Sequence, residues 1–464
     1  MYNINCQNCR NSFTLTEEDQ AFFEKMKVPL PTWCADCRAQ RRMSFCNERN
    51  LYRANCGLCG KSSISMYHPS AVFPIYCREC FWSDKWDGLS YGQDYDFSRP
   101  FFQQFHELKK KVPRVALLQQ GNMEGSDYTN RSSNAKNCYL SFRTNFSEDC
   151  YYTHPANDSK SVVDCLNVQK SELTYASVDC IQCYNVAFCQ ETQNCNDSRF
   201  LYDCRGCTDC FGCANLRNKQ YHIFNQAYSR DEYFAKIKQI NLGDYSQFKD
   251  FQAQFSQFIL KYIRPYMVSL RSDHVTGNWI YDSNNVLNSF GVRNVENGKN
   301  IYGIINAKDC MDYYFWGREC ELIYEVASCG YSCTRIAFSN EIMTSCAELQ
   351  YCDNSSSISN CFGCVGIKNK KFCILNKQYT EAEYKELLPR VIEQMNAMPY
   401  ADKKGRVYKY GEFFPSELSP FAYNETAAVE FFPLTSEEAL EAGFVWRHAE
   451  VKDFGVTVKA ADLP

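Results

Sequence analysis

The sequence predicts a mainly β fold, in which N-terminal four-cysteine zinc-ribbon modules precede a duplicated, narrow parallel β-helix with α-helical caps. Three observations support this fold class. Four Cys-x-x-Cys pairs occupy the first eighty residues of the 464-residue chain, cysteines then recur every fifteen residues, and a 25-residue segment is repeated 151 residues later. We therefore expect metal modules followed by two copies of one solenoid.

Composition limits the class of protein. The chain is 45% hydrophobic and 22% charged with a net charge of −4, which gives no general attraction to nucleic acid or to anionic membranes. The opening stretch MYNINCQNCRNSF has no apolar run of signal-peptide length, and no membrane span is expected. A cytoplasmic location follows, where the 29 cysteines should be thiols or metal ligands rather than disulfides.

The four cysteine pairs predict two structural Zn²⁺ ions, held by zinc ribbon 1 (residues 1–54) and zinc ribbon 2 (residues 55–82). Two residues between cysteines let a tight turn direct both sulfurs at one ion, and a second pair completes a tetrahedron. A closed shell of four thiolates leaves no position for a reacting water, so both ions should be structural. Cys46 is an extra candidate that could replace a ligand. The predicted ligands are Cys6, Cys9, Cys34 and Cys37 in the first site and Cys56, Cys59, Cys77 and Cys80 in the second.

An arginine-rich stretch suggests a contact with nucleic acid as an alternative. Residues 1–82 hold ten Lys/Arg and seven Asp/Glu, or +3, while eight thiolates and two Zn²⁺ ions add −4, so the module sums to −1. The arginines can therefore simply offset the thiolate charge. The candidate contacts are Arg38, Arg41, Arg42, Arg49 and Arg53.

A connector with a helix (83–113) leads into β-helix repeat 1 (114–228). Five cysteines are spaced by fifteen residues, and each follows an Asp or Asn: Cys150, Cys165, Cys180, Cys195 and Cys210. This spacing predicts about fifteen residues per coil. Such a coil is narrow, so inward side chains must be small, and cysteine serves as a small buried hydrophobe. The Asp or Asn should turn a solvated corner.

The stretch DCRGCTDCFGC (203–213) has four cysteines at three-residue intervals: Cys204, Cys207, Cys210 and Cys213. That spacing is typical of iron–sulfur sites. Because three of the four already belong to the fifteen-residue ladders, we interpret them as packing residues. A metal or redox role for stacked thiols remains the alternative.

A duplication organises the second half of the chain. Asp209–Tyr233 aligns with Asn360–Tyr384, and eleven of 25 positions are identical. Each copy should end in a helical cap, at 229–268 and 378–400, with β-helix repeat 2 at 269–377. Unequal coils are expected in repeat 2, because Cys310, Cys320, Cys329 and Cys333 fall out of phase. A tail at 401–464 carries a short helix with a capping box at Thr435 and Glu438.

Two resemblances accompany these patterns. The segment with Cys6, Cys9, Phe13, Thr16, Gln20, Phe23, Cys34, Cys37 and Arg38 resembles a small probable zinc-ribbon family. Through NCFGC…CILNKQY (360–379) and GEFFP…LSPFAYNET (411–426), nearly the whole chain resembles bacterial proteins that join a zinc ribbon to Cys-rich repeats. That family implies the same architecture and no known activity.

No motif for phosphate binding, dinucleotide binding, zinc proteolysis or a nucleophile elbow is present, and the six histidines are scattered. We therefore predict a non-enzymatic zinc-binding scaffold. Its zinc modules should dock a protein partner, and its β-helices should form a rigid, aromatic-rich binding surface. The alternatives are a nucleic-acid or ribosome-associated protein, a carbohydrate-active β-helix enzyme, and a thiol-ladder metal or redox protein.

Overall fold

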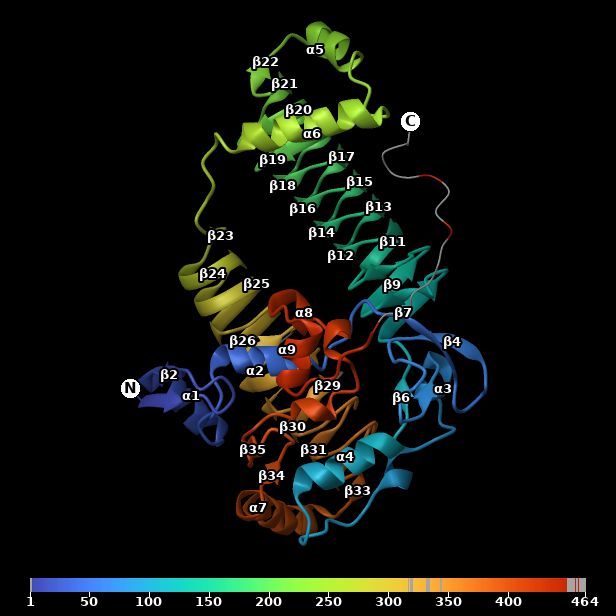
Figure 1. The fold of residues 1–464 in the computed structure, drawn as a ribbon, viewed down its shortest axis with the longest axis vertical. Coiled ribbons are helices and arrows are strands. Elements are labelled where there is room, and N and C mark those ends of the chain that lie inside the picture. Colours follow the sequence, from blue (N-terminus) through green and yellow to red (C-terminus); the bar gives the residue numbers. More distant parts are fainter. Residues whose placement is uncertain are drawn as a thin grey trace. The chain divides into compact units, whose positions relative to one another are not determined.

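A computed structural model describes residues 2–315, 317, 320–330, 334–342, 344–448, 455 and 458. The chain forms two compact units, Met1–Ala116 with Tyr266–Arg447, and Leu117–Pro265 with His448–Pro464. Each unit contains one parallel β-solenoid, as Figure 1 shows in green and in yellow to orange. The predicted fold class, a mainly β protein with a duplicated solenoid, is confirmed. None of the helices in the described ranges combines the length and apolar character needed to cross a bilayer.

The coil holds twelve residues, so the predicted fifteen is wrong. Successive parallel strands pair with a step of twelve, as in Cys150 with Val162 and Val168 with Cys180. The reason is a shorter period: from about residue 126 to residue 213 every third side chain is buried. Four sides of three residues make one coil. Cysteines fifteen residues apart are both inward, but they lie on neighbouring sides rather than in one column.

Each side turns at a residue with a left-handed backbone, directly before the inward residue. Asp149, Asp164 and Asp179 have φ of 54°, 55° and 55°. Asn and Asp adopt this conformation at lower cost than other residues with a side chain, which explains the Asp or Asn before each cysteine. These corner side chains face outward, as predicted. Some of them form ladders, such as Asn167 Nδ2 donating to Asp179 Oδ1 at 2.6 Å.

Small side chains fill the first solenoid, and its inward positions are mainly Ser, Thr, Cys, Ala and Val. Because most inward residues are small, with Leu201 an exception, a twelve-residue coil can close around them. Its strands are β7 (Gln119–Glu124), β8 (Thr129–Asn130), β9 (Ser132–Lys136), β10 (Ser141–Phe142), β11 (Asn145–Tyr151), β12 (His154–Asn157), β13 (Lys160–Val163), β14 (Leu166–Gln169), β15 (Glu172–Tyr175), β16 (Val178–Ile181), β17 (Tyr184–Ala187), β18 (Gln190–Gln193), β19 (Asn196–Tyr202), β20 (Thr208–Ala214), β21 (Gln220–Ile223) and β22 (Gln226–Ala227).

The second solenoid is less regular, as predicted. Its strands pair with a step of eleven at Ser269 and Ile280, and a step of thirteen at Cys310 and Ile323. Valine and isoleucine dominate its interior. Cys333, one of the residues predicted to fall out of phase, lies outside the described residues. The strands are β23 (Ser269–Leu270), β24 (Asp273–Tyr281), β25 (Asn284–Lys299), β26 (Ile305–Tyr314), β27 (Ile323–Cys329), β28 (Ile336–Ala337), β29 (Asn340–Ile342), β30 (Ala347–Gln350), β31 (Ser359–Phe362), β32 (Lys371–Ile374) and β33 (Lys377–Gln378).

Both solenoids end in the same way, which confirms the duplication. The Asn225 amide accepts from the backbone N–H of Ala214 at 2.9 Å and donates to its carbonyl at 2.8 Å. Asn376 makes the same pair of bonds to Val365. These amides take the place of the next coil's backbone, so the backbone groups of Ala214 and Val365 have hydrogen-bond partners.

Helices follow each end. A short antiparallel hairpin leads to α5 (Arg230–Ile237) in the first copy and to α7 (Glu381–Ala397) in the second, and each helix begins with a capping box. The predicted cap helix α6 (Tyr245–Ile259) instead lies along the side of the first solenoid (Figure 1), because its phenylalanines pack there.

The remaining elements of the first unit surround the second solenoid. One core cluster joins α1 (Glu17–Met26), α4 (Phe101–Lys111), α7 and the tail to its outer side. The tail contributes β34 (Tyr400–Ala401), β35 (Val407–Tyr408), α8 (Ala428–Phe431) and α9 (Ser436–Glu441), and Thr435 and Glu438 form the predicted capping box.

Candidate metal centres

The first cysteine cluster is built from a hairpin and a helix. The turn between β1 (Tyr2–Asn5) and β2 (Ser12–Leu15) carries Cys6 and Cys9. Cys34 is the N-cap of α2 (Ala35–Met43), and Cys37 lies in its first turn. The four sulfurs lie within 4.8 Å of one another. Because the second pair starts a helix, the zinc-ribbon prediction is corrected to a treble-clef arrangement.

The second cluster repeats this geometry. Cys56 and Cys59 lie in the turn between β3 (Tyr52–Asn55) and β4 (Ser62–Ser65). Cys77 follows β5 (Ile75–Tyr76) and is the N-cap of α3 (Arg78–Trp82), whose first turn holds Cys80. All four sulfurs again lie within 4.8 Å of one another. The fold thus groups the first two Cys-x-x-Cys pairs in one cluster and the last two in another, as predicted from their order in the sequence.

Both clusters fit zinc. Four thiolates at about 2.3 Å from a tetrahedral ion lie about 3.8 Å apart. Cys9 and Cys34 Sγ are 3.8 Å apart, and Cys59 and Cys77 Sγ are 3.9 Å apart. Each cluster also receives a backbone hydrogen bond at 3.3 Å, from Cys34 N to Cys6 Sγ and from Cys77 N to Cys56 Sγ. With four cysteines around each ion, no ligand position is left for a reacting water.

In the second cluster, hydrogen bonds favour the thiolate form of Cys56, whereas burial raises the pKa values of Cys77 and Cys80. Burial raises the pKa of Cys56, but bonds from the backbone N–H groups of Cys59 and Cys77 outweigh it and lower that pKa to about 6. A thiolate is the form that binds zinc, so this environment prepares a ligand near neutral pH.

Outside the two clusters, the cysteines whose side chains the structure describes are all buried in the interior. In the described part of the chain only the two N-terminal groups bring three or more metal-ligating side chains together. Cys204, Cys207, Cys210 and Cys213 occupy the four consecutive sides of one coil, all fully buried. Cys46 lies in a core cluster, and its thiol donates to Glu48 Oε1 at 3.7 Å.

Three of the five candidate nucleic-acid contacts are buried beneath the surface. Arg38, Arg41 and Arg42 have exposed fractions of 3%, 0% and 0%. They lie on α2 and face the second solenoid. Arg49 and Arg53 remain on the surface, where Arg49 pairs with Glu430. The buried positions argue against nucleic-acid contact through Arg38, Arg41 or Arg42.

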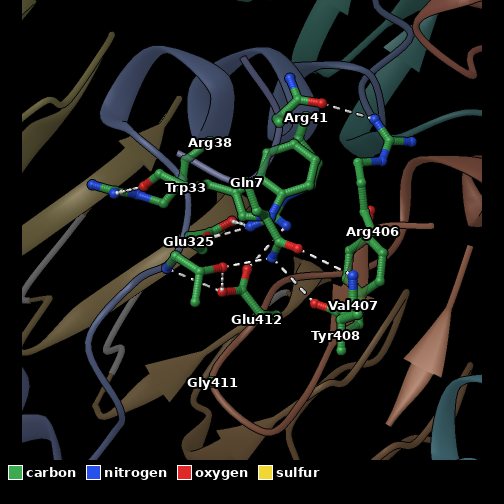
Figure 2. Close-up of polar contacts among 12 residues, drawn as sticks. Gln7, Trp33, Arg38, Arg41, Glu325, Arg406, Val407, Tyr408, Gly411 and Glu412 are labelled. Atoms are coloured by element: carbon green, nitrogen blue, oxygen red, sulfur yellow. Dashed lines mark hydrogen bonds and ion pairs between the residues drawn. The ribbon is translucent and has the colours of Figure 1, made fainter. Parts of the chain in front are cut away.

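Arg41 is the centre of a buried network that joins distant parts of the chain (Figure 2). Its Nη2 lies 2.8 Å from Glu325 Oε1 in β27, and its Nη1 lies 3.2 Å from Glu412 Oε2 in the tail. The guanidinium stacks over Trp33, 4.1 Å from the ring centre. Although burial lowers it, the two carboxylates raise the pKa of Arg41, which therefore stays charged.

Arg38 and Arg42 lie beside Arg41 on the face of α2 that is buried against the second solenoid. Arg38 Nε donates to Asp312 Oδ2 at 2.6 Å, and Arg38 Nη1 to the Trp33 carbonyl. The Arg42 guanidinium has no hydrogen-bond partner among the described residues, and burial lowers its pKa. Sequence reasoning missed the partners of these arginines because Asp312, Glu325 and Glu412 lie hundreds of residues away. From sequence alone, an arginine-rich helix beside cysteine ligands can lie either on the protein surface or in a contact inside the protein.

Comparison with known proteins agrees with this geometry at the N-terminus. A search of curated proteins found no match. Residues 2–45 match the model of a family described as a probable treble clef domain, the part of the chain that holds the first hairpin, the first cysteine cluster and α2.

Proposed function

We propose that the protein is a non-enzymatic zinc-binding scaffold, in which the zinc modules hold the second solenoid and the tail together and a solenoid surface binds a protein partner. The observation that carries this proposal is the burial of the arginine face of α2 against Asp312, Glu325 and Glu412. A module whose most charged face is engaged within its own unit serves assembly of that unit. Rigid solenoids commonly bind partners along their sides.

A cavity in the first unit does not favour an enzyme. It has a volume of about 830 Å³ and lies on the second solenoid, lined by Asp273, Asp282 and Glu296. Asp282 is paired with Arg271 at 2.5 Å and Glu296 with Lys308 at 3.2 Å. A pair of carboxylates for glycoside hydrolysis needs one raised pKa, whereas Arg271 lowers the pKa of Asp282.

Cross-linking of the zinc-loaded full chain in an extract of its native cells tests the scaffold. A recovered protein whose cross-links map to outward solenoid lysines, such as Lys136, Lys160 and Lys170, supports the proposal. A bait that is denatured by heat before cross-linking controls for recovery by unfolded material. Recovery of no protein above that control, or turnover of a polysaccharide by the chain, counts against it.

A further inference from the structure

Aromatic side chains form ladders at the corners of both solenoids, and helices cover them. On the first solenoid, α6 places Phe248 on Phe188 and Phe258 on Phe224, with ring centres 4.9 and 5.1 Å apart. Between them, Phe251 packs on Phe211 at 5.4 Å and Phe255 on Phe200 at 5.7 Å. These four ring contacts hold the helix on the solenoid.

The second solenoid repeats the arrangement with a different helix. Tyr351 and Phe362 stand 151 residues after Phe200 and Phe211. Phe101 of α4 packs on both, at 5.3 and 5.1 Å. Two unrelated helices thus cover equivalent corners, each with phenylalanine.

The dimensions of helix and solenoid match. Phe188 and Phe224 are three coils apart, or about 14 Å at ~4.8 Å per coil. Phe248 and Phe258 are ten residues apart, or about 15 Å at 1.5 Å per residue. Steps of three or four residues along a helix therefore present about one ring to each coil.

One stretch of the same corner carries rings that no helix covers in the part of the chain that the structure describes. The strand pairings place residues that are twelve apart in one column. The column that contains Phe211 also contains Tyr175, Tyr151 and Tyr139. The tyrosine strip, as we call it, consists of Tyr128, Tyr139, Tyr151, Tyr152 and Tyr175. Tyr139, Tyr152 and Tyr175 have exposed fractions of 40%, 55% and 48%.

We propose that the tyrosine strip docks an amphipathic helix of a protein partner, with aromatic side chains at steps of three and four residues. The strip continues the ladder on which α6 lies, so the same ring packing is available to a second helix. Asp164 interrupts the strip, is exposed, and has no ion partner among the described residues. We expect a basic residue on the partner helix to form an ion pair with Asp164. This inference rests on the proposed scaffold function and names its partner class.

The probe is a fluorescein-labelled peptide with the sequence of residues 244–260, an aromatic amphipathic helix that α6 shows to fit this ladder. Its binding to the full chain is measured by fluorescence anisotropy. The variant Tyr139→Ala/Tyr152→Ala should weaken binding by about tenfold or more, since central aromatic anchors carry most of such an interface. Tyr184→Ala is the matched control, because Tyr184 is 46% exposed but lies on another side of the coil. It should bind as the wild type does.

Two results overturn the inference. One is the absence of saturable binding up to about 1 mM peptide. The other is equal affinity for wild type and the Tyr139→Ala/Tyr152→Ala variant, which means that the peptide merely exchanges with α6. If the cross-linking experiment recovers a partner that maps elsewhere while the peptide fails, the scaffold stands and the inference falls. If no partner is recovered, the scaffold function itself falls.

Discussion

At the scale of single residues, the contribution of an arginine to stability depends on whether its charge is buried or exposed. Arg41 and Arg49 lie on the same arginine-rich stretch, yet one is fully buried between two carboxylates and the other is paired on the surface. Removing one partner of a buried pair leaves an uncompensated charge, whereas exposed pairs contribute little. Position in the fold therefore sets the energetic role of each arginine.

Replacing Arg41 by methionine should lower the free energy of unfolding by about 3–5 kcal/mol, because Glu325 and Glu412 stay buried without their cation. The matched change Arg49→Met should cost less than about 1 kcal/mol. Urea denaturation of the zinc-loaded chain measures both. Equal small effects would show that the buried network does not support the unit.

His106 should make stability depend on pH. Burial, and then the positive charges of Lys110 and Lys109, lower its pKa to about 4 from 6.5. The unfolded chain therefore binds a proton that the folded chain resists, so stability falls as pH drops from about 6.5 to about 4. The loss is about 1–3 kcal/mol. His106→Gln should flatten that part of the curve of unfolding free energy against pH, and an unchanged curve would contradict the assignment.

At the scale of elements, the unit of the solenoid is one three-residue side, not the coil. Each side needs one small inward residue and one left-handed corner. Leu173 stands at such a corner with φ of 53° and is 45% exposed, so its backbone is strained without gain from burial.

Leu173→Asn should therefore raise the free energy of unfolding by about 0.5–1 kcal/mol, since Asn adopts the left-handed region more readily. The amide also enters the column that holds Asn185. Leu166 is equally exposed, at 46%, but has no positive φ, so Leu166→Asn is the matched control and should give no gain. Thermal unfolding of both variants checks this, and equal shifts would refute the corner strain.

At the scale of the whole molecule, the first cysteine cluster is connected through α2 to the assembly of the first unit. Helix α2 begins at a candidate metal ligand, Cys34, and carries the arginines that contact the second solenoid and the tail. Structural zinc contributes directly to folding free energy.

Elemental analysis should find two zinc ions and no iron per chain. Cys37→Ser should reduce this to one zinc and increase hydrogen exchange of α2 amides, while β11 to β18 of the other unit stay protected. Cys207→Ser is the control. Serine already occupies many inward positions of the solenoid, so zinc content should remain two. Metal lost with Cys207, or iron in the wild type, would restore the cysteine-rich coil as a metal site.

The sequence by itself determined the two zinc-type clusters, the parallel solenoid, its duplication and the outward Asp and Asn corners, because each depends on local spacing. The coil length was missed since cysteines mark only some inward positions. The mostly small residues at every third position from Ser132 to Cys213 indicate sides of three residues, from which a twelve-residue coil can be built.

Only the tertiary structure decided where Arg38, Arg41 and Arg42 lie and which aromatic ladders are covered. Arg38 bonds to Asp312, which is 274 residues away, and Arg41 bonds to Glu325 and Glu412, which are 284 and 371 residues away. A helix with phenylalanines at regular steps suits either the end or the side of a solenoid. Such choices depend on which surfaces fold against one another, and local spacing carries no information about that.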